Sequence, residues 1–468
     1  MKKNYFSACV VLFISVATTF AQVNFNNGGG THQWSNTSNW SGGALPSATD
    51  IVEVNGAVAY IDTNTSQTIH LLQNSTDRTT NHYFGSPPNA SDPNTSSTGT
   101  ITININDPND PGSGVINNPT NYAIHQQSTS KTNFVFDGNI TINNSAGKGR
   151  SILRVSGNSD NQLIFRRLSV LNLVGGSNTI AYAANSTAKI KFNGTITGNK
   201  NLLIGQGTTS FGSTADNSAH SGNIQFLAGA NVTVTEETVD YQPVFINGST
   251  LSIGDSNTNV SLTLNALNTV QGGATLKILN NNTLNLYVNK SQNGFGVLDF
   301  NKSSSNGTLN LDMASGTAIQ FADSSLEDWG SGTVNITSFV SGSKVKFGAN
   351  GNGISAAQLA KITTTPGPGP NEVLSIDSNG WLKFESTLGV ENHNAFEFTV
   401  YPNPAKDVLK INTQQQLQKV EIADLLGRTV LTQQNVSKSV DVSLLSKGVY
   451  IIKLTSEKGI STKKIIKE

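Results

Sequence analysis

The stretch GTITININD, residues 99–107, decides the fold of most of this 468-residue chain. Its isoleucines Ile101, Ile103 and Ile105 alternate with Thr and Asn, so a β-strand would place them all on one face. Similar short runs recur between about residues 24 and 349, including NTLNLYVN at 282–289 and GTLNLDM at 307–313. Gly, Asn, Ser or Asp follow these runs, and such residues suit tight corners. The sequence therefore predicts an all-β body.

A right-handed parallel β-solenoid (β-helix) is the architecture that we expect for residues 22–385. Each coil of a solenoid buries its inward stripe by stacking on its neighbours, so very short strands suffice. A series of Ig-like sandwiches is the alternative, since short strands recur at suitable intervals. Sandwiches would show Trp or Tyr landmarks at regular spacing. With aromatic residues at 7% and four Trp, the chain lacks that pattern.

The N-terminus, MKKNYFSACVVLFISVATTFAQ, has the features of a secretory signal peptide. Lys2 and Lys3 precede a short apolar run, and small residues lead to a predicted cleavage between Ala21 and Gln22. The single cysteine, Cys9, lies inside this segment, so the mature chain is expected to have no disulfide and no Cys-bound metal. We also expect no transmembrane segment in the mature chain, since no other run is long and apolar enough.

The last part of the chain differs in composition from the rest. Residues 396–468 hold 11 Lys+Arg and 7 Asp+Glu, whereas residues 22–395 hold 17 and 23. This change predicts a second module at 396–468 after a polar linker at 386–395. Turn residues divide the module into seven strands, expected at 396–401, 408–411, 417–423, 429–432, 439–442, 449–454 and 462–466. Strands of this number and length predict a small antiparallel Ig-like β-sandwich.

The C-terminal module resembles the type A C-terminal sorting domain of the type IX secretion system of Bacteroidetes. The matching residues, in order along the chain, are Tyr401, Pro402, Asn403, Pro404, Ala405, Asp424, Leu425, Leu426, Gly427, Arg428, Leu445, Gly448, Val449, Tyr450, Lys463, Lys464, Ile465, Ile466 and Lys467. The resemblance implies two partners: the outer-membrane type IX translocon, and the peptidase that cleaves the sorting domain. It also implies passage through the periplasm to the cell surface or the medium. An ordinary Ig-like accessory module is the alternative. We further expect Lys463, Lys464 and Lys467 to offer a strand edge and positive charge to a partner.

Three segments of the body resemble autotransporter passenger domains, which are β-solenoids. Residues 207–234 resemble their strand repeat, with Ser221-Gly222 and Ala228-Gly229 at the expected places and His220 where an aromatic residue is usual. Residues 347–382 resemble the closing unit, which we place at about 347–385. Residues 32–56 resemble the N-terminal segment of the same passengers. The resemblance implies an exported β-solenoid and no particular activity.

Enzymes built on β-solenoids gather carboxylates or basic residues on one face, so we examined each charged cluster. Two acidic clusters could supply a glycosidase pair: Glu236, Glu237 and Asp240, and separately Glu327 and Asp328 beside Trp329. Solvated loops are the preferred interpretation of both. Asp107 and Asp110 lack the ligand order of a calcium loop and are interpreted as turn residues. No catalytic residue, metal ligand or cofactor is therefore predicted.

Basic and aromatic residues were considered as binding groups. Lys148, Arg150, Arg154, Arg166 and Arg167 would form a patch for an anionic glycan if neighbouring coils aligned them, but surface scatter is the preferred interpretation. Trp34 and Trp40 could stack on sugars, but a cap over the first coil accounts for them. The six histidines, at 32, 70, 82, 125, 220 and 393, show no ligand spacing. Neither module is basic enough to bind nucleic acid.

The sequence thus predicts a secreted or cell-surface protein with a structural or adhesin-like solenoid, and not an enzyme. A polysaccharide-binding or polysaccharide-degrading lyase or hydrolase on the same scaffold is the alternative. Surface glycans are accordingly a further candidate partner. A coil-by-coil map of outward charged side chains discriminates the two hypotheses, because an enzyme needs several of them to converge on one face.

Overall fold

The computed structural model divides the chain into two compact units, residues 1–385 and 386–468. It describes residues 21–54, 66–69, 71–74, 82–84, 100–105, 122–129, 133–136, 138–144, 151–176, 178–184, 187–212, 214–235, 243–254, 259–301, 306–387, 396–434 and 438–468. The predicted signal peptide, apart from Ala21, and the predicted linker from residue 388 to 395 lie outside these residues.

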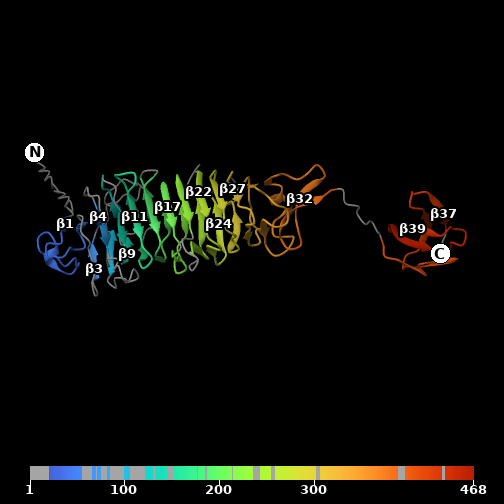
Figure 1. Ribbon diagram of the computed structural model, residues 1–468, viewed down its shortest axis with the longest axis horizontal. Helices are drawn as coiled ribbons and strands as arrows, with labels where there is room; N and C mark the ends of the chain where they lie inside the picture. Colours follow the sequence, from blue (N-terminus) through green and yellow to red (C-terminus); the bar gives the residue numbers. More distant parts are fainter. Residues whose placement is uncertain are drawn as a thin grey trace, which may run out of the picture. The chain divides into compact units, whose positions relative to one another are not determined.

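The first unit is a parallel β-solenoid, as predicted. Its strands stack as thin rungs into three sheets, here called sheets 1, 2 and 3 (Figure 1). In order of stacking, sheet 1 contains β1 (Gln22–Phe25), β2 (Ile51–Val54), β4 (Leu71–Asn74), β7 (Tyr122–Gln126), β10 (Ser151–Val155), β13 (Thr179–Ala183), β16 (Leu202–Ile204), β18 (Ile224–Phe226), β21 (Thr250–Ile253), β24 (Ala274–Ile278) and β26 (Phe295–Asp299).

In the described coils, sheet 2 contributes eleven strands and sheet 3 contributes five. Sheet 2 contains β5 (His82–Phe84), β8 (Asn133–Phe136), β11 (Gln162–Phe165), β14 (Lys189–Phe192), β17 (Gly207–Phe211), β19 (Ala230–Val234), β22 (Asn259–Leu264), β25 (Thr283–Val288), β27 (Thr308–Met313), β29 (Thr333–Thr337) and β31 (Ile362–Thr365). Sheet 3 contains β3 (Ser66–Ile69), β6 (Thr100–Ile105), β9 (Asn139–Asn144), β12 (Val170–Gly175) and β15 (Thr195–Gly198). Two-stranded sheets follow it: β20 (Ile246–Asn247) with β23 (Val270–Gln271), and β28 (Ile319–Phe321) with β30 (Val345–Phe347).

Strict register between coils aligns identical side chains. Thr283, Thr308 and Thr333 are paired in succession, so these coils are 25 residues long. The residue that follows each threonine points inward. These residues, Leu284, Leu309 and Val334, are at most 1% exposed. The period-two alternation of the sequence therefore marks the inward and outward faces correctly.

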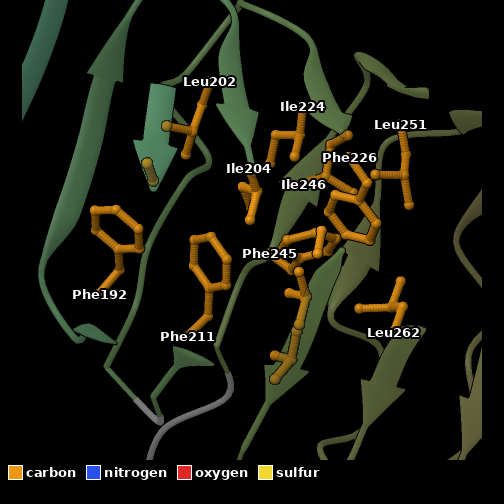
Figure 2. Close-up of a cluster of buried hydrophobic side chains, with 14 of the residues drawn as sticks. Phe192, Leu202, Ile204, Phe211, Ile224, Phe226, Phe245, Ile246, Leu251 and Leu262 are labelled. Carbon is orange, nitrogen blue, oxygen red and sulfur yellow. The ribbon is translucent and has the colours of Figure 1, made fainter. Parts of the chain in front are cut away.

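The interior of the solenoid is one continuous hydrophobic core that runs from Phe25 to Leu382. Phe136, Phe165, Phe192 and Phe211 stack in sheet 2, with successive ring centroids 5.2 Å apart. Figure 2 shows Phe192 and Phe211 beside the aliphatic side chains Leu202 and Ile204, which come from sheet 1. Each coil thus buries its apolar stripe against the next, and no coil has a core of its own.

Asparagine side chains form a ladder on the outer face of sheet 2. Asn310 Nδ2 donates to Asn285 Oδ1 (2.9 Å), and Asn335 Nδ2 donates to Asn310 Oδ1 (2.9 Å). The ladder continues at both ends, from Asn285 to Asn259 (2.6 Å) and from the Thr363 hydroxyl to Asn335 (2.6 Å). These bonds join neighbouring coils from outside, in addition to the backbone ladder.

Tight corners need glycine where the backbone of the next coil passes close by. Gly198 adopts φ +95°, and a Cβ there would lie 2.1 Å from the carbonyl oxygen of Leu173 in the coil below. Gly222 has ordinary φ, but its Cβ would lie 2.3 Å from the carbonyl oxygen of Lys200. The high glycine content of the chain follows from this close stacking.

The two ends of the solenoid are covered by irregular segments. At the N-terminal end, the short 3₁₀ turn η1 (Thr37–Asn39) carries Trp40, whose Nε1 donates to Trp34 O (2.8 Å). Both tryptophans are at most 2% exposed, which supports their interpretation as a cap. At the C-terminal end, α1 (Ala356–Leu359) begins with a capping box between Ser355 and Gln358, and β32 (Glu372–Ile376) pairs with β33 (Leu382–Ser386).

The second unit is a small antiparallel sandwich with a separate core, as predicted. One sheet has the order β34 (Thr399–Tyr401), β35 (Val408–Asn412), β38 (Ser439–Asp441). The other has the order β37 (Thr429–Gln434), β36 (Leu417–Ala423), β39 (Gly448–Ser456), β40 (Gly459–Lys467). Leu409, Val420, Ile422, Val440, Ile452 and Leu454 are fully buried between them. All seven expected strands are present, although the first begins at Thr399 and not at Phe396.

Candidate functional site

The segment Pro402-Asn403-Pro404-Ala405 covers the outer edge of the last strand, β40. Ala405 N donates to Ile466 O (2.8 Å), and Glu468 N donates to Ala405 O (2.9 Å). Between the two prolines, which lack an N–H, Asn403 replaces the backbone: its Oδ1 accepts from Ile466 N (2.7 Å) and its Nδ2 donates to Lys464 O (3.3 Å). The motif therefore closes a strand edge that would otherwise be open to pairing.

Side chains of β40 also attach the beginning of the second unit. Ser461 Oγ accepts from Phe396 N (2.9 Å) and donates to Phe396 O (2.7 Å). Lys463 Nζ donates to Phe398 O (3.0 Å) and lies 5.7 Å from the centroid of its ring. Our expectation of a free edge at β40 is thus wrong from Lys464 onward, because residues 403–405 occupy that part of the edge. These contacts also explain why Phe396 to Phe398 do not extend β34.

The hairpin between β36 and β37 presents two leucines on a rigid turn. Arg428 binds Asp424 Oδ2 through Nε (2.8 Å) and Nη2 (2.7 Å), while Asp424 Oδ1 accepts the backbone N–H groups of Leu426 and Arg428. These bonds lower the pKa of the Asp424 carboxyl, the backbone bond from Arg428 most of all. Gly427 adopts φ +78° at the corner. Leu425 and Leu426 remain 71% and 81% exposed, so this tip is a candidate contact for a partner.

The other predicted sorting residues lie on β39 and β40. Gly448 begins β39 and pairs with Lys467. Tyr450 is 8% exposed, and its hydroxyl donates to Ser446 O (2.9 Å). Lys464 is exposed and pairs with Ile451. Tyr401 is 50% exposed at the end of β34. At the other end of the chain, the predicted signal-peptide cleavage lies between Ala21 and Gln22. Gln22 is the first residue of β1.

A row of polar side chains crosses the outer face of sheet 1. The pairing places Glu53, Gln73, His125, Arg154 and Tyr182 next to one another on successive strands. The Arg154 guanidinium lies 5.3 Å from the Tyr122 ring centroid and 5.5 Å from that of Tyr182. This row was missed at the sequence level, because its members are separated by loops of unequal length.

Two members of the row are buried, and the other three are half-buried. Glu53 is 1% exposed and His125 is 7% exposed, and His125 Nε2 is hydrogen-bonded to Ser156 Oγ (2.8 Å). Burial and then the positive charge of Arg154 lower the pKa of His125 to about 3, so the ring is neutral at physiological pH. Burial likewise raises the pKa of the Tyr122 hydroxyl.

The outward charges of the other described coils are dispersed. Lys277 pairs with Asp299 on sheet 1 (2.9 Å), whereas Lys189 and Lys191 lie on sheet 2. The basic residues singled out from the sequence are not gathered: Arg154 lies on sheet 1, while Arg166 and Arg167 follow a strand of sheet 2. Lys148 and Arg150 lie outside the described residues.

The acidic candidates have structural roles where they are described. Trp329 is 1% exposed and donates to Leu298 O (3.0 Å), while Asp328 accepts from Gly330 N (2.9 Å) in a turn. The backbone carbonyl oxygen of the neighbouring Glu327 accepts a hydrogen bond from Gln358 Nε2 of α1 (2.8 Å). The remaining acidic candidates, Glu236, Glu237, Asp240, Asp107 and Asp110, lie outside the described residues.

Among the described residues, the histidines do not join a group of metal ligands. His220, at the position where the passenger resemblance expects an aromatic residue, is 3% exposed, and this burial lowers its pKa. His70 and His393 lie outside the described residues. Within the part of the chain that the structure describes, no group of three His, Cys, Asp or Glu side chains is close enough to hold a metal ion. In the same part, no helix combines the length and apolar character needed to cross a bilayer.

Comparison with known proteins identifies the second unit. Residues 399–468 match the family described as "Secretion system C-terminal sorting domain". The chain is a substrate of the type IX secretion system. The matched segment begins at the first residue of β34. It includes the edge-closing motif, the Asp424–Arg428 turn and β40. The sorting domain directs export to the cell surface or the extracellular space.

A search of characterised proteins matches a short part of the chain. Beta-agarase D of Zobellia galactanivorans is 34% identical over 90 residues, which are 18% of this chain. The match covers 19% of that relative, so the chain spans about a fifth of its length. No solved structure matches the chain significantly.

Proposed function

We propose that the solenoid is an adhesive structural protein that acts outside the cell. Parts of the outer faces of sheets 2 and 3 support this proposal, because they present columns of short, uncharged polar side chains. On sheet 2, the column of Thr283, Thr308 and Thr333 runs beside that of Asn285, Asn310 and Asn335. Such a face forms hydrogen bonds with neutral partners and repels neither acidic nor basic surfaces.

Sheet 3 carries a second face of this kind. Thr102 pairs with Thr141, which pairs with Asn172, and Asn172 pairs with Thr197. Thr141, Asn172 and Thr197 line a shallow hollow of about 360 Å³. The observation that carries the proposal is this combination: a continuous rod-forming core, neutral polar faces and a sorting domain that takes them outside the cell.

The adhesive function is tested with cells that export the native chain and cells that lack it. We expect the exporting cells to be retained on polysaccharide-coated or host-like surfaces, and the purified mature chain to compete for that retention. Equal retention of both strains, without competition by the purified chain, would contradict the proposal.

A polysaccharide-degrading enzyme is the second candidate. The similarity to beta-agarase D supports it, although the matched portion is small on both sides. This candidate predicts that the purified mature chain releases reducing ends from agarose or another neutral polysaccharide. Turnover would establish it, whereas binding without turnover would favour the adhesive function.

A further inference from the structure

A polar hollow of about 510 Å³ opens on the solenoid surface near its C-terminal end. It lies where β26, β28 and β30 of neighbouring coils meet. Phe295 and Phe321 border it from the core, where they are 4% and 3% exposed. The rim carries amide side chains from Asn293, Gln320 and Asn350, together with the carboxylate of Asp323. The volume lies within the ordinary range of small-ligand sites.

The carboxylate of Asp323 is held in a fixed position. Its Oδ1 accepts from Ser325 N (3.0 Å) and from Ser325 Oγ (2.6 Å). The bond from the Ser325 hydroxyl is the largest cause of a lowered pKa at Asp323, so the carboxyl group is ionised at neutral pH. Asp323 itself is exposed, so its remaining oxygen is accessible to a ligand.

The turn that carries Asp323 is anchored to the solenoid core through Ser324, which is fully buried. Ser324 Oγ accepts from Leu298 N (3.0 Å), and Ser324 N donates to Gly353 O (2.8 Å). Gln358 Nε2 of the closing helix donates to Ser324 O (2.7 Å). The rim of the hollow is thus organised before any ligand arrives, which reduces the entropy lost on binding.

The opposite side of the hollow is also rigid and supplies hydrogen-bond donors. Asn350 Oδ1 accepts from Asn352 N (2.9 Å), so its Nδ2 is the group left to donate outward. Gly348 adopts φ +64°, and a Cβ there would approach the Cβ of Asp323 to 3.4 Å. A larger residue at 348 would therefore narrow the hollow.

We propose that this hollow binds one sugar unit of a neutral polysaccharide. A carboxylate that only accepts, beside amides that both donate and accept, matches the adjacent hydroxyl groups of a pyranose ring. The inference rests on the extracellular location in the proposed function, and it adds a defined binding site.

The test uses the mature full-length chain and isothermal titration with neutral oligosaccharides prepared from agarose, cellulose and starch. We expect at least one of them to bind, and Asp323→Ala to weaken that binding about tenfold or more, since a charge-assisted hydrogen bond is lost. Asp328→Ala is the matched control. Asp328 forms the same kind of turn bond, to Gly330, but it does not line the hollow, so affinity should be unchanged.

Three results would overturn the proposal: no binding to any of the oligosaccharides, equal affinity of the native chain and Asp323→Ala, or Ca²⁺ binding that depends on Asp323 in the absence of sugar binding. The proposed adhesion can be judged separately. If the Asp323→Ala chain still confers normal retention of cells, adhesion stands and the hollow is not its site.

Discussion

The side chain of Asn403 makes hydrogen bonds that a neighbouring β-strand would otherwise make with its backbone. Placed between two prolines, it reproduces the donor and the acceptor that a neighbouring strand would offer to Ile466 and Lys464. Since proline cannot donate to a ladder, this arrangement closes the edge without extending the sheet. The sorting motif is therefore a structural requirement of the domain as well as a candidate recognition feature.

Replacing Asn403 by alanine should destabilise the sorting domain. Two hydrogen bonds at an exposed edge are lost, so the free energy of unfolding should fall by roughly 1–2 kcal/mol. Denaturant unfolding of the full chain measures the change, as the difference in the free energy of unfolding of the sorting domain. Asn412→Ala on β35 is the control. If both variants unfold alike, the edge-closing role of Asn403 is incorrect.

His125 should make the solenoid sensitive to mild acid. Its folded-state pKa of about 3 lies below the ordinary value of 6.5, so the unfolded chain binds the proton more readily. Stability is therefore complete above about pH 6.5 and decreases as the pH falls toward 3. Between pH 7 and pH 5 the loss from this residue should be about 2 kcal/mol.

The variant His125→Gln separates this contribution from general acid effects. It keeps a group that can bond to Ser156 but has no titratable ring, so its unfolding midpoint should shift less between pH 7 and pH 5 than that of the native chain. His32→Gln, in the N-terminal cap, is the matched histidine substitution away from this row. An identical pH shift in the native chain and His125→Gln would contradict the assignment.

At the scale of elements, the strands are held by repetition between coils. The stacked rings of Phe165, Phe192 and Phe211 occupy one inward column, and the Asn ladder occupies an outward one. Each strand is short, so its stability depends on the strands above and below it. A destabilising substitution in one coil should therefore also lower the stability of the adjacent coils.

Phe192→Ala should cost roughly 3–5 kcal/mol, because it leaves a cavity between two stacked rings inside the core. Thermal unfolding of the mature chain measures the effect, and hydrogen exchange should show lost protection in β14 and in the adjoining strands β11 and β17. Phe384→Ala, at a half-buried ring near the closing segment, should cost less. Protection lost in β14 alone would argue against coupling between coils.

At the scale of the whole molecule, the chain consists of two units with separate cores. The solenoid core extends from Phe25 to Leu382, and the core of the sorting domain begins at Phe396. Removal of the sorting domain should therefore leave the solenoid folded while removing its route out of the cell.

A chain that ends at residue 385 should unfold with the same solenoid midpoint as the full chain and should accumulate in the periplasm. Fractionation followed by limited proteolysis measures both properties. A chain that lacks only 461–468 should also be retained, since the loss of most of β40 removes the partner of β39 and the attachment of Phe396. Normal surface levels of either chain would refute the role of the sorting domain in its export.

Much of this architecture could be predicted from the sequence, because it depends on local signals. Alternation with period two identifies the strands and their inward residues, as at Leu284 and Leu286. The motif from Tyr401 to Ala405, with those that follow it, identifies the sorting domain. A strand's two faces and a turn's residue types are determined within a few positions of the chain.

The tertiary structure alone decided which side chains meet between coils. The row from Glu53 to Tyr182 and the hollow around Asp323 join residues that are tens of positions apart, and their alignment depends on the length of every intervening corner. A corner longer by one residue would turn the following strand's other face inward. The sequence by itself therefore determined that the chain is an exported β-solenoid, and only the stacking of its coils decided where a ligand can bind.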